Sequence, residues 1–196
     1  MIVPLTKQSE SGKSYTYVLT PKEMYLFLDK LNVEYRMRAE MMFQTGMRIA
    51  EIYHFVNHPE YFRKENAAIF LPHVKEIGKH KCTIKQRSVL LSPKGVRVVE
   101  DFINHKITMP AYQNMEEAFK LAATKAGFDT KYFTPKLTRK SYVSWLMAVF
   151  PELKDQISHS AGHDPATMQR YYLTYGWRKE DVKDMRDELK GWGNTE

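Results

Sequence analysis

Apolar side chains repeat at helical spacing soon after the start of the chain. Met24, Phe27, Leu28 and Leu31 occupy positions i, i+3, i+4 and i+7, which lie on one face of a helix. The four residues from Thr20 (TPKE) provide an N-cap, a proline at the first helical position and a capping-box glutamate. We therefore predict that a helix begins directly after Thr20.

The same spacing, together with capping and terminating residues, predicts more helices along the chain. Gly46 and Gly127 have the C-terminal position that glycine favours, and Ser92 and Thr134 each precede a proline that can open a helix. Pro151 is expected to end the helix before it. The predicted helices cover about 34 to 43, a segment starting near Arg48, 93 to 103, 115 to 126, 136 to 149, 152 to 158, 166 to 174 and 180 to 190.

One region has a different pattern. Between Ala67 and Leu91, the segments AAIFLPHV and RSVLLS have the composition of short strands, and a polar stretch containing Gly78 joins them. Pro72 lies inside the first segment, which predicts an edge strand or a bulge. The expected fold class is therefore mainly α with a small antiparallel β-sheet or hairpin (α+β).

Length, composition and charge limit the classes of protein to which this chain can belong. The chain has 196 residues, 43% of them hydrophobic, and a formal net charge of +7. This length suits one domain with short extensions, and the basic balance favours a polyanionic partner. The single cysteine excludes an internal disulfide, and no Cys and His residues have the spacing of a structural zinc site. With no signal peptide and no membrane-spanning run, we expect an intracellular, cytoplasmic protein.

Two segments place arginines beside turns or helix starts. The first is Thr45 to Ile52 (TGMRIAEI), with Arg48 after a glycine turn, and the second is Thr134 to Lys140 (TPKLTRK), with Arg139. Cations at a helix N-terminus oppose the helix dipole, so the basic second segment is more favourable with an anion bound. Arginine pairs in this setting are suited to hold a phosphate through two oxygens.

Two later segments supply a histidine and a tyrosine. The first is Ala161-Gly162-His163, and the second is QRYYL, from 169 to 173. Tyr172 lies nine residues after His163, and Tyr171 is the competing candidate one residue earlier. A tyrosine hydroxyl can attack a phosphodiester and remain attached to it, which makes this pair of tyrosines candidate nucleophiles.

The order and separation of these four segments resemble the catalytic domain of the tyrosine recombinase (phage integrase) family, and most closely the integrases of archaeal viruses and proviruses. The resemblance implies the fold shared by tyrosine recombinases and type IB topoisomerases. It also implies that Arg48, Arg139 and His163 hold the scissile phosphate and that Tyr172 is the nucleophile. Lys136 stands where the family usually has histidine. Lysine binds phosphate as a point charge and is a poorer proton acceptor at neutral pH.

The family also has a catalytic lysine on a β-hairpin between its two arginines. Here Lys81 and Lys85 are both suitably placed, and we favour Lys85 because KQRSVLL resembles the start of the second hairpin strand. The segment is strongly basic, so the expected DNA contacts include further side chains. These are Lys75, Lys79, Arg87 and, outside the hairpin, Lys140.

The resemblance implies a site-specific recombinase that cuts and rejoins double-stranded DNA through a 3′-phosphotyrosyl intermediate, with neither metal nor cofactor. Two alternatives remain open: a DNA relaxation activity like that of type IB topoisomerases, and a DNA-binding protein of the same fold without chemistry, including an integrase that has lost activity. A denaturation-resistant protein–DNA adduct distinguishes the enzymes from the binding protein.

We expect three parts: an N-terminal arm from 1 to 19, a catalytic domain from 20 to 177 and a C-terminal helical tail from 178 to 196. Family members usually have a helical core-binding domain before the catalytic one, for which this sequence has no room. We therefore expect an excised catalytic half or a minimal recombinase that forms dimers or tetramers on DNA. The apolar stripe of the tail, which contains Met185 and Leu189, predicts packing either on its own core or on a neighbouring subunit.

Overall fold

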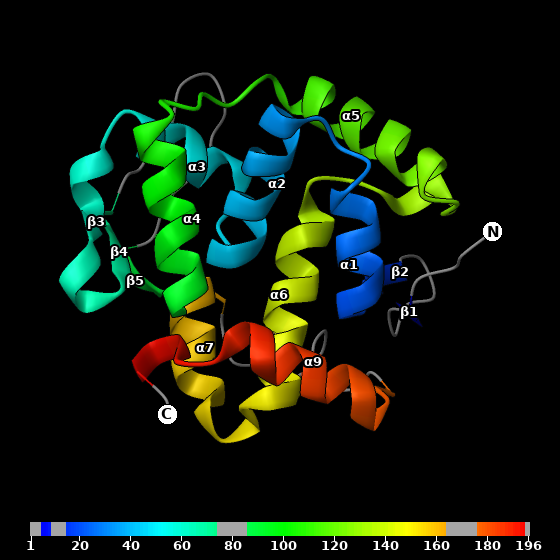
Figure 1. Ribbon diagram of the computed structural model, residues 1–196. Helices are drawn as coiled ribbons and strands as arrows, with labels where there is room; N and C mark the ends of the chain where they lie inside the picture. The colour runs from blue at the N-terminus through cyan, green and yellow to red at the C-terminus, as the bar shows by residue number, and fades with distance from the viewer. Residues whose placement is uncertain (1–4, 9–14, 74–85, 164–175, 195–196) are drawn as a thin grey trace.

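The computed structural model describes residues 5–8, 15–73, 86–163 and 176–194 of the chain. In this part there are eight α-helices and one small sheet at one side of the molecule, and a second, two-stranded sheet lies near the N-terminus (Figure 1). The helices are α1 (Pro21–Leu28), α2 (Val33–Thr45), α3 (Ile49–Val56), α4 (Pro93–Asn104), α5 (Tyr112–Lys125), α6 (Lys136–Val149), α7 (Lys154–Ala161) and α9 (Lys179–Leu189). Short 3₁₀ turns cover Pro59–Tyr61, Lys64–Asn66, Thr130–Tyr132, Pro151–Leu153 and Trp192–Asn194.

Most helix boundaries agree closely with those predicted from capping residues. Helix α6 spans the predicted segment, and α2 ends at Gly46, whose φ of 59° is left-handed. Helix α7 begins later than expected because a 3₁₀ turn occupies Pro151–Leu153. The helix predicted at 166 to 174 lies outside the described residues.

The small sheet has three antiparallel strands in the order β3 (Phe62–Arg63), β4 (Ala68–Leu71) and β5 (Arg87–Leu90). The interpretation of Pro72 was therefore wrong in one respect. Strand β4 is the central strand, and it ends at Leu71, so the proline follows the strand and removes no hydrogen bond from the ladder. In the register, Leu71 lies opposite Arg87, so the last residue of β4 pairs with the first residue of β5.

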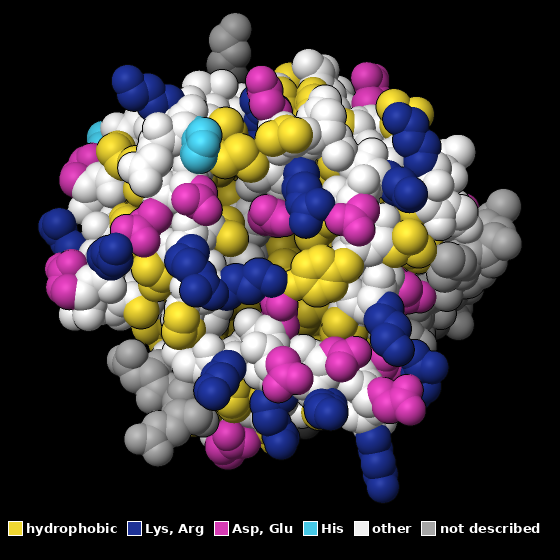
Figure 2. Space-filling view, viewed as in Figure 1, with side chains coloured by type: hydrophobic (Ala, Val, Ile, Leu, Met, Phe, Trp, Pro, Cys, Tyr) yellow, Lys and Arg dark blue, Asp and Glu magenta, His cyan; other side chains and the backbone are white. Residues whose placement is uncertain are grey.

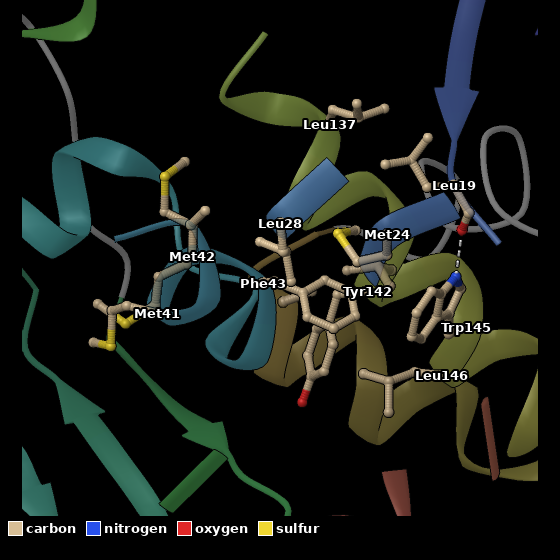
Figure 3. Packing of buried hydrophobic residues seen from close by; sticks show 14 of the residues in the cluster. Leu19, Met24, Leu28, Met41, Met42, Phe43, Leu137, Tyr142, Trp145 and Leu146 are labelled. Atoms are coloured by element: carbon tan, nitrogen blue, oxygen red, sulfur yellow. Dashed lines mark hydrogen bonds between the residues drawn. The ribbon is translucent and has the colours of Figure 1, made fainter. Parts of the chain in front are cut away.

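Helix α6 is the centre of the molecule and packs against α2, α7, α9 and β2. The rings of Tyr142 and Trp145 on α6 both meet Phe43 of α2 edge to face, with centroids 5.6 and 4.8 Å apart (Figure 3). Edge-to-face contact is a favoured geometry of aromatic pairs. Because α6 is buried on nearly all sides, the arginine near its N-terminus is held by a rigid element.

The N-terminal segment is not a loose arm throughout. Residues 15–18 form β2, which pairs with β1 (Leu5–Gln8), and Val18 and Leu19 are fully buried. The backbone N–H of Leu19 donates to Ser141 Oγ (2.9 Å), and its carbonyl accepts from Trp145 Nε1 (2.8 Å). The end of the expected arm, at Val18 and Leu19, therefore packs into the core around α6.

The apolar stripe of the C-terminal tail faces the molecule's own core. Met185, Leu189 and Trp192 are fully buried, and Trp192 Nε1 donates to the Leu90 carbonyl (3.0 Å). Helix α9 runs across the base of the molecule in the view of Figure 1 and contacts α6 and α1. Of the two interpretations of this stripe, the structure shows packing on the chain's own core, so these three side chains are not available to a second subunit.

A polar cluster fastens the same tail from its other side. The carboxylate of Glu188 accepts from Gln44 Nε2 (2.5 Å), Lys94 Nζ (2.8 Å) and the Tyr25 hydroxyl. Burial raises the pKa of Tyr25, and the hydrogen bond to Glu188 raises it further, so this tyrosine stays protonated. The cluster joins α1, α2 and α4 to α9.

The capping box at Thr20 gives a first testable prediction. Thr20 Oγ1 accepts from the Glu23 N–H (3.3 Å), and Glu23 Oε2 accepts from the Thr20 N–H (2.8 Å). Thr20→Ala should therefore lower the free energy of unfolding by about 1 kcal/mol, measured by urea denaturation. Thr20→Ser keeps the hydroxyl and should lose much less; equal losses in the two variants would assign the effect to the methyl group instead.

Candidate active site

Two left-handed glycine turns bring distant segments together. Gly46 (φ 59°) ends α2, and a Cβ added there would lie 2.9 Å from the Tyr142 ring. Gly162 (φ 63°) ends α7, and a Cβ there would lie 3.0 Å from Arg87 Nε. Both positions therefore require glycine for backbone conformation and for space. The turn at Gly46 also places Arg48 as the residue that precedes α3.

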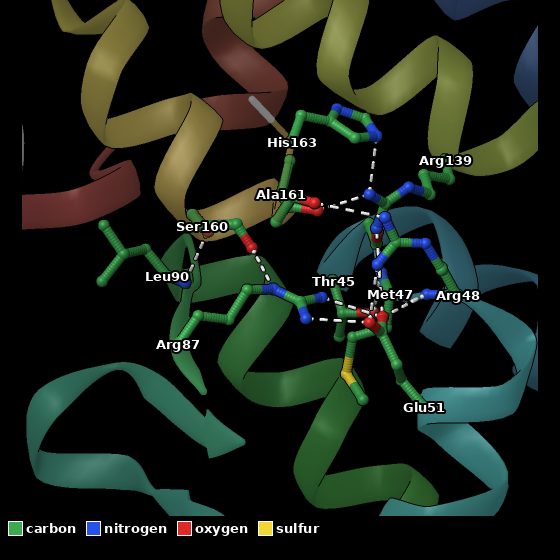
Figure 4. Close-up of polar contacts among 12 residues, drawn as sticks. Thr45, Met47, Arg48, Glu51, Arg87, Leu90, Arg139, Ser160, Ala161 and His163 are labelled. Atoms are coloured by element: carbon green, nitrogen blue, oxygen red, sulfur yellow. Dashed lines mark hydrogen bonds and ion pairs between the residues drawn. The ribbon is translucent and has the colours of Figure 1, made fainter. Parts of the chain in front are cut away.

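The end of α7 gathers three arginines from three parts of the chain. Its successive carbonyls each accept a hydrogen bond from a different guanidinium: Ser160 from Arg87 (2.9 Å), Ala161 from Arg139 and Gly162 from Arg48 (3.2 Å) (Figure 4). The last carbonyls of a helix lack partners within the helix and carry partial negative charge. They therefore attract and orient cations, and here they place three side by side.

A buried glutamate lies at the centre of these arginines. Glu51 is 1% exposed and accepts two hydrogen bonds from Arg87, each 2.8 Å long. It also accepts from Arg48 Nη1 (2.9 Å) and from the Arg48 backbone N–H (2.6 Å), and Arg139 Nη1 lies 3.9 Å away. The carboxylate thus fixes the positions of the cations without neutralising the group as a whole.

Burial alone raises the pKa of Glu51, but hydrogen bonds from Arg87 and the charges of Arg87, Arg139 and Arg48 outweigh it and lower the pKa from 4.5 to about 2. A carboxyl whose pKa is depressed by folding stabilises the folded state above its unfolded pKa. This contribution is lost as the pH falls through the folded value. We therefore expect the free energy of unfolding to decrease between pH 4.5 and pH 2, with Glu51 accounting for a loss on the order of 3 kcal/mol.

This pH dependence can be checked by urea denaturation at a series of pH values within that window. Glu51→Gln removes the titrating group, so its free energy of unfolding should depend less steeply on pH than that of the wild type. Parallel curves for the two proteins would show that Glu51 does not carry the effect.

His163 lies directly beside Arg139. Arg139 Nη2 is 2.8 Å from His163 Nε2. Because a guanidinium only donates, Nε2 of the imidazole is the acceptor in this arrangement and carries no proton. Arg139 Nη1 donates to the Gly46 carbonyl as well, so this side chain connects the turn after α2 to the turn after α7.

These cations border a pocket of about 350 Å³ between the N-terminal ends of α3, α5 and α6. Lys136 and Lys140 line it together with Arg48, Arg139 and His163, and none of its described lining residues is acidic. Lys136 is exposed, and Lys140 is partly buried. Burial lowers the pKa of Lys140, and the charge of Lys136 lowers it further.

The structure brings together Arg48, Lys136, Arg139, Lys140 and His163 of the predicted site. Five other predicted residues lie outside the described part of the chain: Lys75, Lys79, Lys81, Lys85 and Tyr172. The competing Tyr171 lies outside it too.

Arg87 requires a correction. It was expected to contact DNA, but it is 4% exposed and donates to Glu51 and the Ser160 carbonyl. Its guanidinium is therefore placed to hold Glu51 and α7, not to face a phosphate backbone. Glu51 was not among the predicted site residues, although its position three residues after Arg48, at the start of a helix, suits a glutamate that caps the Arg48 N–H.

The distribution of charged side chains over the surface in Figure 2 does not identify a binding site by itself. On the face drawn in Figure 2, Lys and Arg side chains are interspersed with Asp and Glu. Among the described residues, no three His, Cys, Asp or Glu side chains are close enough together to hold a metal ion. Within the same residues, no helix is both long and apolar enough to cross a membrane.

No protein-family model matches the sequence, and no curated protein matches it either. Solved structures do resemble the fold. The Tn1549 transposon integrase in complex with circular intermediate DNA has a TM-score of 0.63 at 17% identity, with 88% of this chain and 64% of that chain covered. XerA recombinase gives 0.59 at 15% identity, covering 88% and 63%. XerH site-specific recombinase bound to difH gives 0.59 at 17%, covering 86% and 56%.

These similarities establish the fold. The chain is mainly helical with a small antiparallel sheet, as in the catalytic domains of tyrosine recombinases. It spans less than two thirds of the length of each of the three proteins.

Proposed function

We propose that this protein cuts and rejoins double-stranded DNA as a tyrosine recombinase. The observation that carries the proposal is the convergence of Arg48, Arg139 and His163, from three distant segments, at one cationic pocket. Stabilising the charge on phosphate oxygens is the main task of an enzyme that transfers a phosphoryl group. Two adjacent guanidinium groups, held by backbone carbonyls and a buried carboxylate, are suited to that task.

In the proposed reaction, the Tyr172 oxygen forms a bond to phosphorus, and the proton of its hydroxyl passes to solvent water. The bond between phosphorus and the 5′ oxygen breaks, and Lys85 or Lys81 supplies the proton to the leaving oxygen. A 5′ hydroxyl from a second strand then attacks the 3′-phosphotyrosyl link and releases the enzyme. The phosphoester bond is exchanged, not hydrolysed, so no energy source is required.

The test is covalent trapping on duplexes of randomised sequence that carry a nick, since the target site is unknown. The wild type should form an adduct that survives denaturation, and peptide mapping should find the nucleotide on Tyr172. Tyr172→Phe should form none, while Tyr171→Phe should form a normal amount. The opposite result would make Tyr171 the nucleophile. Good binding of the duplexes without any adduct would refute the enzymatic proposal.

A sulfur atom at the 5′ bridging position can identify the acid. A thiol leaving group has a much lower pKa than an alcohol, so it departs without a proton. We expect Lys85→Ala to cleave ordinary DNA poorly and the sulfur-containing DNA at nearly the wild-type rate. Lys81→Ala provides the matched comparison. If the sulfur-containing DNA restores cleavage only in the Lys81→Ala variant, Lys81 is the acid.

The DNA product distinguishes a recombinase from a type IB topoisomerase. Joining of strands from two different duplexes is expected of a recombinase, whereas relaxation of supercoiled plasmid without exchange is expected of a type IB topoisomerase. We also propose that protomers assemble on DNA inside the cell. The suggested likeness to archaeal viral integrases depends on the sequence segments alone.

A further inference from the structure

The pocket beside the arginines has a second, apolar wall that phosphate binding does not use. Met42 and Met47, both buried, line it with Ile49, Pro135 and Tyr112. A site for a bare phosphate has no need of such a wall, because its ligand is entirely polar. The combination of cations on one side and an aromatic ring and thioethers on the other suits a ligand with both characters.

We propose that this pocket holds the deoxyribose and base of the nucleotide whose phosphate the arginines bind, with Tyr112 as its aromatic wall. The proposal rests on the proposed function in taking DNA as the source of that phosphate. It adds that one nucleoside next to the cleaved bond leaves the duplex stack and is bound by its apolar surface, so Tyr112 contributes to substrate positioning.

Size and charge favour this occupant. The volume of about 350 Å³ is near the lower limit for small-molecule sites, which suits one nucleoside and not a longer segment. Arg48, Lys136, Arg139 and Lys140 supply positive charge to the same space. The phosphate of a nucleotide can therefore lie against the cations while its base lies against Tyr112, as bases stack on aromatic side chains in single-strand binding proteins.

Tyr112 is held in a suitable place for this role. It is the first residue of α5, is partly exposed and lines the pocket across from α3. Burial raises the pKa of its hydroxyl, and the charge of Glu116 raises it further. The residue is thus only partly buried, and part of it stays accessible.

The experiment uses methionine methyl groups as reporters. Protein with ¹³C-labelled methionine methyls is titrated separately with inorganic phosphate, 2-deoxyribose 5-phosphate and deoxyadenosine 5′-monophosphate, and spectra are recorded by NMR. We expect affinity to increase along this series. The nucleotide alone should shift the Met42 and Met47 methyl signals through the ring current of adenine. Intermolecular NOEs between adenine protons and the Tyr112 ring should appear in the wild type.

Variants test the role of the ring. Tyr112→Ala should weaken nucleotide binding roughly 5- to 100-fold and leave phosphate binding unchanged, since stacking on an aromatic ring is lost. Tyr112→Phe should bind like the wild type. Leu121→Ala is the matched control, because Leu121 is 58% exposed on the same helix and does not line the pocket.

Three outcomes would overturn the proposal: equal affinity for nucleotide and phosphate, no shift of the two methionine signals, or equal weakening of both ligands by Tyr112→Ala. The NOEs keep the test decisive even if the alanine variant does not fold. Nucleotide binding without any covalent adduct would reject the proposed reaction but retain the pocket. An adduct without selective nucleotide binding would retain the proposed reaction and reject the nucleoside pocket.

Discussion

Arg139→Lys should reduce the rate of DNA cleavage by about 100- to 1,000-fold, which is the usual cost of removing one donor that stabilises transition-state charge. Arg139 donates to the Gly46 and Ala161 carbonyls and to His163 at once. A lysine keeps the charge but has a single ammonium on a flexible stem, so it cannot reproduce this fork. The expectation assumes the proposed cleavage reaction.

The measurement is the single-turnover rate of adduct formation at saturating DNA, with binding measured separately. Because Arg139 is 7% exposed, folding of the variant must be verified by its unfolding transition. Arg186→Lys, the same change at an exposed position of α9, is the control and should cleave normally. A folded Arg139→Lys protein with nearly normal cleavage would remove Arg139 from the proposed phosphate clamp.

Arg87→Met should lower the free energy of unfolding by about 3–5 kcal/mol, the usual cost of breaking a buried ion pair from one side. Arg87 and Glu51 have side chains that are 2% and 1% exposed, and two hydrogen bonds join them. Removing the arginine leaves a buried carboxylate whose closest remaining partner is Arg48. The loss should be visible in urea denaturation at neutral pH, where Glu51 is ionised.

A double-mutant cycle isolates the pair itself. Glu51→Met alone should also be strongly destabilising, whereas Arg87→Met combined with Glu51→Met should lose clearly less than the two single losses together. Additive losses would show that the two side chains act independently. The double variant also separates structure from function: we expect it to fold but cleave slowly, because Arg48 loses the carboxylate that orients it.

Much of the helical architecture could be predicted, because helix starts and ends depend on a few neighbouring residues. Thr20 with Glu23 and the glycine at 46 are examples in which the local residues were sufficient. Strand β3 could not be predicted, since its two residues have no pattern of their own and are a strand only through pairing with β4. The buried state of Leu19 likewise depends on Ser141 and Trp145, far along the chain.

The candidate site, like the fold, could be predicted from the sequence only in part. The resemblance of the sequence segments to tyrosine recombinases implied that Arg48, Arg139 and His163 share one site, and the structure places these three side chains at one pocket. The role of Arg87 was predicted wrongly, and no role was predicted for Tyr112. A basic residue in a basic segment gives no sign of burial, and Tyr112 lies in a loop-to-helix junction without a recognisable motif.

The sequence by itself determined which segments are helical, where glycine turns interrupt them and which arginines, histidine and lysines are candidates for phosphate chemistry. Helices and glycine turns depend on interactions within a few residues, so local composition is enough for them, whereas the candidates for phosphate chemistry follow from the resemblance to a family. Tertiary structure alone decided that Glu51 and Arg87, 36 residues apart, form a buried pair and that the apolar stripe of the tail faces its own core. It also decided that the carbonyls ending α7 hold three arginines side by side, two of which, Arg48 and Arg139, line one pocket. A charged side chain can be buried only where its partner is supplied, and distant segments supply that partner when the chain folds.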